Sequence, residues 1–70
     1  MVEASKIKEN MEVKGSDGKH LGTVDCTEGQ RVKLASCGML HYIELETVDS
    51  IEDGTVWLTE TAVDAMRTWH

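Results

Sequence analysis

The sequence predicts a mainly β protein, a small barrel of about six short strands followed by a short C-terminal helix. Residues 13–24 and 41–58 each join apolar stretches of strand length to an Asp-Gly pair, which favours a tight turn. After residue 60 the apolar residues adopt a helical spacing instead. The 70 residues are close to the lower limit at which a hydrophobic core alone can offset the chain entropy, so we expect one domain over residues 1–70. Its expected parts are an N-terminal turn (1–10), a barrel (11–59) and a helix (61–69).

The first expected elements are a helical turn and a short strand. Residues 4–9 form the turn, with Ile7 and Met11 as its buried contacts. Residues 11–13 alternate between apolar and polar side chains, as a short strand does. Residues 15–18 then end in an Asp-Gly pair that supplies the positive φ angles of a hairpin turn.

The second strand is expected over residues 21–27, and its register depends on the turn that follows it. Gly22 within this strand indicates a bend or a close approach of another backbone segment. A two-residue turn would place Val24 opposite Ala35, whereas a three-residue turn, or an equivalent bulge, places Val24 opposite Leu34. We favour the second register because it gathers the apolar side chains on one face.

The favoured register also keeps the two cysteines apart. Cys26 then faces Val32 in the core, and Cys37 lies opposite Leu21, five residues along the strand from Cys26. At ~3.3 Å per residue the cysteines are on the order of 16 Å apart, beyond the ~7 Å limit for a disulfide. We therefore expect free thiols, with Cys26 buried and unreactive.

A break at residues 35–38 precedes the next expected strand. In that strand His41, Ile43 and Leu45 share a face, because side chains alternate along an extended chain. A kink then separates this strand from Val48.

The last hairpin contains Asp53-Gly54, a signal for a two-residue type I′ turn. Such a turn makes Ile51 and Val56 opposite partners on the inner face. Trp57 then points outward, where it either contacts a partner protein or lies under the C-terminal helix.

The C-terminal segment has the pattern of one short amphipathic helix. Residues 61–64 fit a variant capping box, and Ala62, Ala65, Met66 and Trp69 recur at helical spacing. A helix of about two turns is not stable alone in water. We therefore expect the Met66/Trp69 stripe to dock on the barrel or on a partner.

Most of these segments match the pattern of one small bacterial family. They are residues 5–13, 15–18, 21–25, 41–43, 48–50, 58–59, 61–62 and Trp69. In order and spacing they resemble DUF2171, a domain of unknown function related in pattern to PRC-barrel domains. The resemblance extends over nearly the whole chain. It implies an SH3-like or PRC-type barrel that acts as a non-catalytic docking module.

The chain departs from the family pattern in two places. Glu44 stands between Ile43 and Leu45 where the family usually has proline, so the edge or kink that proline enforces is not imposed covalently. The loop before His41 is also shorter than usual, and residues 37–39 replace polar residues there. A family binding site formed by that loop would be altered in this chain.

The net charge of −6 lies entirely in the second half of the chain. Residues 1–35 balance six basic against six acidic side chains, whereas residues 36–70 contain one basic and seven acidic ones. Nucleic-acid binding depends on Lys and Arg contacts with phosphates, so we do not expect it. The acidic half either aids solubility or faces a basic protein partner.

Membrane association is not expected either. The apolar runs are only a few residues long, far short of the ~20 needed to span a bilayer. The first residues also lack the apolar core of a secretory signal. We therefore expect a cytoplasmic protein.

The residues that could hold a metal ion are His20, Cys37 and His41. Imidazole and thiolate suit zinc, but no two of these residues have ligand spacing. The simpler interpretation of His41 is a packed or rim imidazole with one hydrogen bond. The serines lie at caps or turns and Cys37 has no base placed beside it, so we expect no enzyme and no cofactor.

The sequence therefore predicts a non-enzymatic module for protein–protein docking or self-association, bound to a protein partner or to a second copy. Its expected contact residues are Trp57, Tyr42, Met66 and Trp69. Tryptophan and tyrosine are enriched among the residues that anchor protein interfaces. The alternative is a metal- or redox-responsive binding protein that uses Cys37, His41 and His20.

Overall fold

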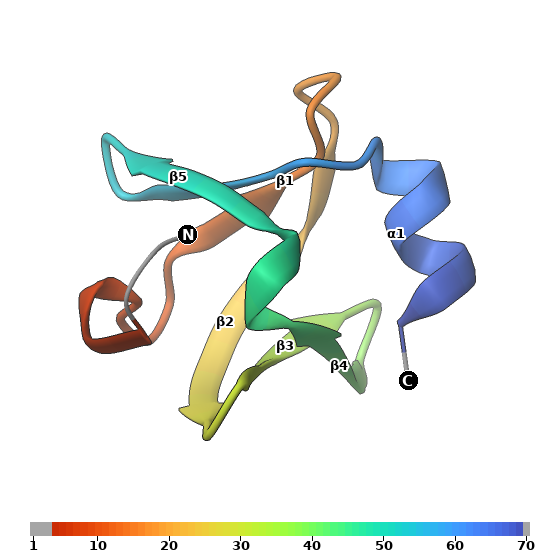
Figure 1. Cartoon of the computed structure of the whole chain (residues 1–70). Helices are drawn as coiled ribbons and strands as arrows, with labels where there is room; N and C mark the ends of the chain where they lie inside the picture. The colour runs from red at the N-terminus through yellow and green to blue at the C-terminus, as the bar shows by residue number, and fades with distance from the viewer. Residues whose placement is uncertain (1–3, 70) are drawn as a thin grey trace.

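Six strands form one sheet in the computed structural model, which describes residues 4–69 (Figure 1). The strands are β1 (Glu12–Lys14), β2 (His20–Glu28), β3 (Arg31–Ser36), β4 (Met39–Glu44), β5 (Val48–Glu52) and β6 (Thr55–Leu58). The remaining elements are the 3-10 turns η1 (Ala4–Lys6) and η2 (Leu45–Thr47) and the seven-residue helix α1 (Ala62–Thr68). The predicted fold class, mainly β with a short C-terminal helix, is confirmed.

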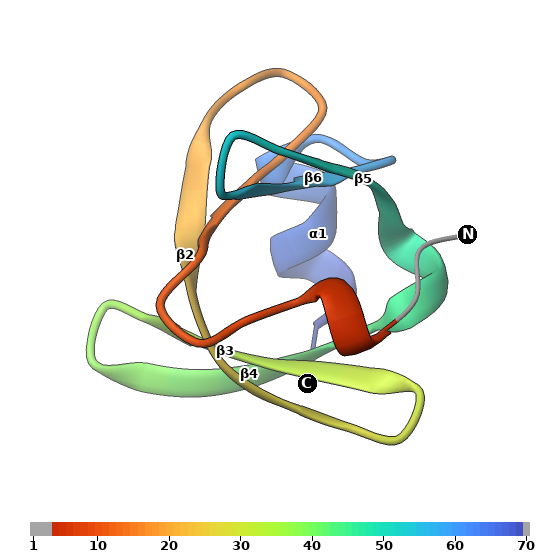
Figure 2. The same cartoon turned by 90° about the vertical axis from the view of Figure 1, so that its left-hand side faces the viewer.

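The strands follow the order β4-β3-β2-β1-β6-β5 in the sheet. All neighbours pair in antiparallel fashion except β1 and β6, which are parallel. The β3–β4 and β5–β6 hairpins lie on opposite sides of the molecule, with α1 behind the space between them (Figure 2). Within residues 4–69, β4 and β5 are the two edges of the sheet, and η2 joins them without a strand pairing. The sheet is therefore open, and the expected closed barrel is not confirmed.

The pairing of β2 with β3 combines a tight turn with a bulge. Val24 lies opposite Leu34, as the favoured register predicts. The turn itself has two residues, however, and the extra residue is Asp25, which forms a bulge in β2. Cys26 therefore lies opposite Lys33 and is only partly buried. The expectation of a buried Cys26 is wrong because the bulge lies before the cysteine and turns it away from the core.

The β5–β6 hairpin has the predicted turn. Asp53 and Gly54 have φ angles of 52° and 74°, as a type I′ turn requires. Ile51 pairs with Val56, which confirms the predicted register. Val56 is buried, whereas Trp57 beside it is half-buried.

The break expected at residues 35–38 is in fact another tight turn. Cys37 and Gly38 have φ angles of 52° and 79°, and β3 and β4 pair right up to them. Cys37 is therefore an exposed turn residue and not the strand partner of Leu21. Sequence reasoning misses this turn because cysteine seldom adopts a positive φ. Both cysteines are free thiols, as predicted.

The core is built from aliphatic side chains of every strand and of α1. Its buried members are Ile7, Val13, Leu21, Val24, Val32, Leu34, Ile43, Leu45, Val48, Val56, Leu58, Ala62 and Ala65. Met11 packs against this core, as expected together with Ile7. Gly22 permits a close approach of β3, because a Cβ atom there would collide with the carbonyl oxygen of Ala35. The predicted close approach at Gly22 is thus confirmed.

Helix α1 begins against the turn between β1 and β2. The Thr61 hydroxyl accepts a hydrogen bond from the backbone N–H of Asp64 at 3.2 Å, as a helix cap does. Asp17 Oδ1 accepts a long hydrogen bond, 3.4 Å, from the N–H of Ala62. A side chain at Gly15 would collide with the backbone nitrogen of Ala62. The start of the helix is therefore fixed by direct backbone contact with the turn.

The expected apolar stripe of α1 docks only in part. Ala62 and Ala65 are buried, and Trp69 packs against the core. Met66, by contrast, is 44% exposed. The side of α1 that carries Met66 is thus exposed.

Candidate functional site

Two hollows border α1 in the part of the chain that the structure describes. A cavity of about 210 Å³ lies between β4, η2 and the last turn of α1, and we call it the α1 cavity. A groove of about 430 Å³ lies between β2, the β3–β4 turn and Met66, and we call it the α1 groove. The sequence-predicted contact residues divide between these hollows and a third one near Trp57.

The α1 groove is bordered by exposed apolar side chains. It is lined by His20, Leu21, Gly22, Thr23, Ala35, Ser36, Cys37, Gly38 and Met66. Leu40 and Met39 are the cross-strand partners of Ala35 and Ser36, and they follow directly after the β3–β4 turn that borders the groove. Met39 is 63% exposed and Leu40 is 52% exposed. Large apolar side chains gathered at one exposed place are typical of an interaction surface.

The α1 cavity has an aromatic and acidic lining. Tyr42 and Glu44 belong to β4. Glu60 directly precedes the helix cap Thr61, and Trp69 directly follows α1. Trp69 stacks on His41, with ring centroids 3.8 Å apart and ring planes 5° from parallel. The stack holds the indole against β4, so His41 is a packed imidazole.

Glu60 has an incomplete hydrogen-bond environment. Its Oε2 atom is buried, and no group in residues 4–69 hydrogen-bonds to it. Its backbone carbonyl accepts a hydrogen bond of 2.8 Å from the N–H of Ser16, which holds the residue in place. A buried carboxylate oxygen without a donor costs free energy, and such an oxygen in a protein calls for an explanation.

Tyr42 and Cys26 both lie near Lys33 on the outer face of the sheet. The Lys33 ammonium is 5.8 Å from the centroid of the Tyr42 ring, and Tyr42 raises the pKa of Lys33. Burial raises the pKa of the Cys26 thiol, and the charge of Asp25 raises it further. Cys26 therefore carries less of the reactive thiolate at neutral pH than an ordinary cysteine.

Trp57 lies apart from the other predicted contact residues. Lys14 Nζ lies 5.5 Å from the centroid of its ring, and Ser50 is its strand partner in β5. Trp57 lines a hollow bordered by β5, β6 and Ser16, whereas Tyr42 and Trp69 line the α1 cavity. The structure thus joins Tyr42 with Trp69, places Met66 in the neighbouring groove, and leaves Trp57 separate.

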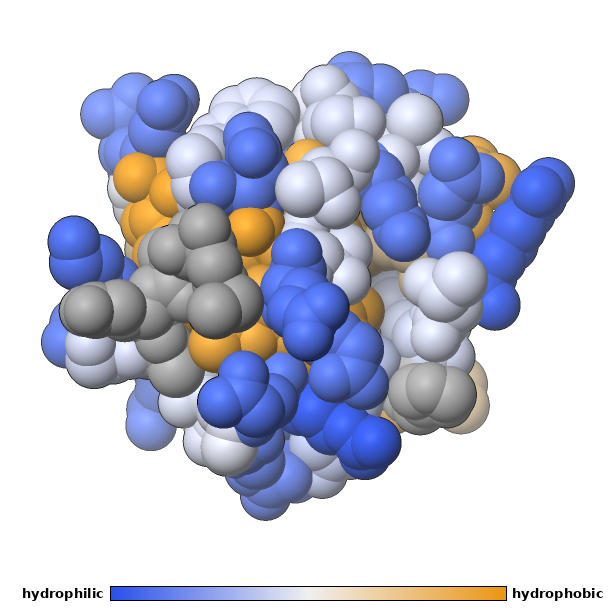
Figure 3. Space-filling view, viewed as in Figure 1, coloured by the Kyte–Doolittle hydropathy of each residue, from blue (hydrophilic) through white to orange (hydrophobic). Residues whose placement is uncertain are grey.

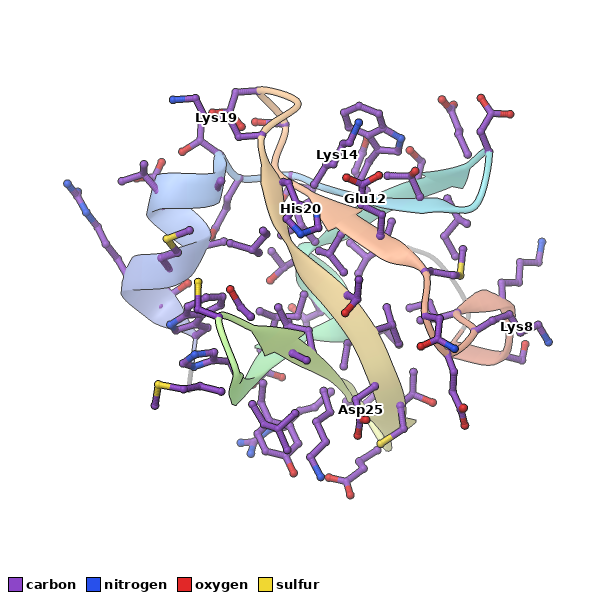
Figure 4. The ribbon with its side chains drawn as sticks, turned by 180° about the vertical axis from the view of Figure 1, so that it is seen from behind. Lys8, Glu12, Lys14, Lys19, His20 and Asp25 are labelled. Atoms are coloured by element: carbon purple, nitrogen blue, oxygen red, sulfur yellow. The ribbon has the colours of Figure 1, made fainter. Side chains whose placement is uncertain are left out.

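The predicted metal-ligand candidates do not converge. His20 and Cys37 line the α1 groove, whereas His41 is stacked on Trp69. His20 Nδ1 lies 2.9 Å from Glu12 Oε2, and Figure 4 shows these two side chains next to Lys14. In residues 4–69 no group of three or more His, Cys, Asp or Glu side chains is placed to hold a metal ion. The metal-responsive alternative therefore has no site in this part of the chain.

Sequence reasoning misses Met39, Leu40 and Glu60. Recognition of the turn at Cys37-Gly38 would have placed Leu40 opposite Ala35 and thus at the groove. No local signal marks Glu60, because the α1 cavity that it lines is formed by α1 together with β4 and η2, which come well before it in the chain.

Residues 7–66 match a family model described as an uncharacterized protein conserved in bacteria, DUF2171. The chain belongs to this family. The matched residues of this DUF2171 chain include all six strands and α1 as far as Met66, so most of both hollows lies within them. Trp69 lies outside the match. No curated protein and no solved structure matches the chain.

The structure also bears on membrane crossing. Among residues 4–69 no helix has the length and apolar character needed to cross a bilayer.

Proposed function

We propose that this DUF2171 domain is a non-enzymatic docking module that binds a basic, apolar segment of another protein in the α1 groove. The observation that carries this proposal is the exposure of three large apolar side chains, Met39, Leu40 and Met66, in or near this groove. Met66 of α1 lines the groove, and Met39 and Leu40 begin β4 directly after the β3–β4 turn that lines it. A volume of about 430 Å³ falls within the range of about 300–1,000 Å³ typical of binding pockets.

The charge distribution favours a basic partner over a second copy. Residues 36–70 contain seven acidic side chains and one basic one; of these, Glu44 lies in β4, and Asp64 and Arg67 lie in α1. Complementary charge attracts a basic segment and steers it to the surface. Two copies, each with a net charge of −6, would instead bring like charges together.

The thiol beside the α1 groove bears on the non-enzymatic part of this proposal. Cys37 and His20 both line the α1 groove, and His20 is oriented by Glu12. In residues 4–69, however, the Cys37 thiol forms no hydrogen bond with His20 or with another base. An activated cysteine needs such a base within reach.

The proposal can be tested with defined peptides. A fluorescent synthetic peptide of alternating Leu and Lys should bind the chain, and its counterpart with Glu in place of Lys should not. Met66→Glu should weaken binding by about tenfold or more, because it replaces an apolar contact with a charge. The added negative charge would by itself attract the basic peptide, so a loss of binding isolates the apolar contact.

Gln30→Glu is the matched control. It adds the same charge at an exposed position in the β2–β3 turn, away from the residues that line the groove. Binding measured by fluorescence anisotropy should be unchanged in this variant. No binding of the basic peptide, or equal losses in both variants, would contradict the proposal.

A further inference from the structure

We propose that the α1 cavity binds the ammonium group of a lysine side chain carried by the partner's basic segment. This inference rests on the proposed docking function and names the contact that anchors the partner. It concerns a hollow separate from the α1 groove, lined by Ala65 and Thr68 of the same helix and not by Met66.

The first observation is the unpartnered carboxylate oxygen. Glu60 Oε2 is buried, and within residues 4–69 it has no hydrogen-bond donor. The hydrogen bond from Ser16 to the Glu60 carbonyl and the adjacent helix cap at Thr61 fix the backbone on both sides. The backbone of Glu60 is therefore fixed, and a rotation of its side chain turns the unpartnered oxygen toward the α1 cavity that Glu60 lines, where an ammonium group supplies the missing donor.

The second observation is the aromatic lining. Trp69 borders the α1 cavity and is held in place by its stack on His41, whereas the Tyr42 ring lies near Lys33 although Tyr42 also borders the cavity. The face of an indole or phenol ring attracts a cation through its quadrupole. Carboxylate and aromatic side chains together form the chemistry that recognises an organic cation.

The third observation is the charge of the lining. Among the described residues that line the α1 cavity, Glu44 and Glu60 are acidic and none is Lys, Arg or His. Arg31 pairs with Glu44 at 3.5 Å, but it does not line the cavity. The α1 cavity thus has an uncompensated negative charge at Glu60.

The size and the donor geometry favour lysine. A volume of about 210 Å³ is several times the roughly 30 Å³ share of one water molecule, so an alkylammonium end can enter. Oε2 is the one Glu60 oxygen that the protein shields from water, and a single shielded oxygen suits the point charge of an ammonium group. The planar fork of arginine is matched instead by two carboxylate oxygens.

The test uses a lysine probe and its uncharged counterpart. Nα-acetyl-lysine N-methylamide is titrated into the labelled chain and followed by heteronuclear NMR. We expect saturable shifts at the amides of Ala65 and Thr68 and at the Trp69 indole, with a dissociation constant on the order of millimolar. Nα-acetyl-norleucine N-methylamide, which has a similar chain without the ammonium group, should cause none of these shifts.

Two matched variants locate the contact. Glu60→Gln should weaken binding of the lysine probe by about tenfold, the effect of losing one charge-assisted hydrogen bond. Glu46→Gln removes the same charge from an exposed residue of η2 that does not line the α1 cavity, and it should change binding by less than about twofold. Glu60→Gln should also raise the melting temperature of the free chain by about a few degrees, because it removes an uncompensated charge. A Glu60 with only a structural role would give a lower melting temperature in this variant.

The outcomes separate this inference from the docking proposal. Equal binding of the lysine and norleucine probes to the original chain would overturn the ammonium site. Unchanged binding of the lysine probe to Glu60→Gln would overturn it as well. Neither result bears on the binding of the basic peptide in the α1 groove, which the Met66→Glu variant tests separately. Met66→Glu should leave the lysine probe unaffected, so a loss of peptide binding in that variant with intact probe binding assigns each ligand to its hollow.

Discussion

Cys37 combines an unfavourable backbone conformation with a position in the proposed docking surface. Its φ angle of 52° lies in the left-handed region, which is costly for a residue with an ordinary side chain. Asparagine and glycine are the residues that such a turn prefers. The Cys37 side chain lines the α1 groove, so the strained residue coincides with the proposed binding surface.

Substitution of Cys37 should therefore change stability in a direction that depends on the new residue. Cys37→Asn should raise the free energy of unfolding by about 1 kcal/mol, because asparagine tolerates the left-handed conformation. Cys37→Val should lower it, since a β-branched residue fits this conformation poorly. Urea denaturation of the three proteins measures both effects. An asparagine variant no more stable than the original chain would show that the turn is not strained.

At the scale of the elements, turn residues determine how much of the fold can be predicted. Asp53-Gly54 specifies a tight turn, so the register of β5 and β6 follows from the sequence. The turn at Cys37-Gly38 also has two positive φ angles, but its first residue is cysteine, where asparagine or aspartate would signal a tight turn. The bulge at Asp25 has no local signal either, and it decides that Cys26 faces outward.

The candidate site could be predicted less well than the strands. The inner and outer faces of a strand follow from alternation, which is a local property. The faces that meet across the molecule depend on the position of α1. That position is set by the contact of Gly15 with Ala62 and by the stack of Trp69 on His41. These pairs are distant in sequence, so Trp69 and Tyr42 could be selected as contact residues but not placed together.

The contact between the β1–β2 turn and α1 leads to a further prediction. Gly15→Ala should lower the free energy of unfolding by about 1–3 kcal/mol, because its Cβ atom would collide with the backbone at Thr61 and Ala62. It should also expose Trp69 by displacing the helix, which quenching of tryptophan fluorescence can detect. Gly29→Asn is the control, since no atom lies within 4 Å of a Cβ there and asparagine tolerates its φ of 59°. Equal losses in the two variants would contradict the proposed role of Gly15.

At the scale of the whole molecule, charge is the dominant surface property. The face shown in Figure 3 carries mostly hydrophilic side chains, with small hydrophobic areas between them. The net charge of −6 on a chain of 70 residues produces a repulsive field between copies at low ionic strength. This field opposes self-association while it attracts a basic segment.

We therefore expect the chain to be monomeric across micromolar concentrations in low salt. Sedimentation velocity at several concentrations measures this directly. Added salt should weaken the binding of the basic peptide, because it screens the attraction between opposite charges. A concentration-dependent dimer in low salt would contradict this expectation and would instead favour a second copy as the occupant of the α1 groove.

The parallel pairing of β1 with β6 has a consequence for how the chain folds. It joins residues 12–14 to residues 55–57, whereas the β2–β3, β3–β4 and β5–β6 pairings are all between neighbours along the chain. Closing so long a loop carries a large entropy cost before any contact forms. The hairpins can therefore assemble early, and on a ribosome the sheet could not be completed until β6 had emerged. A pairing of only three residues on each strand would then set the order in which the chain becomes a single folded unit.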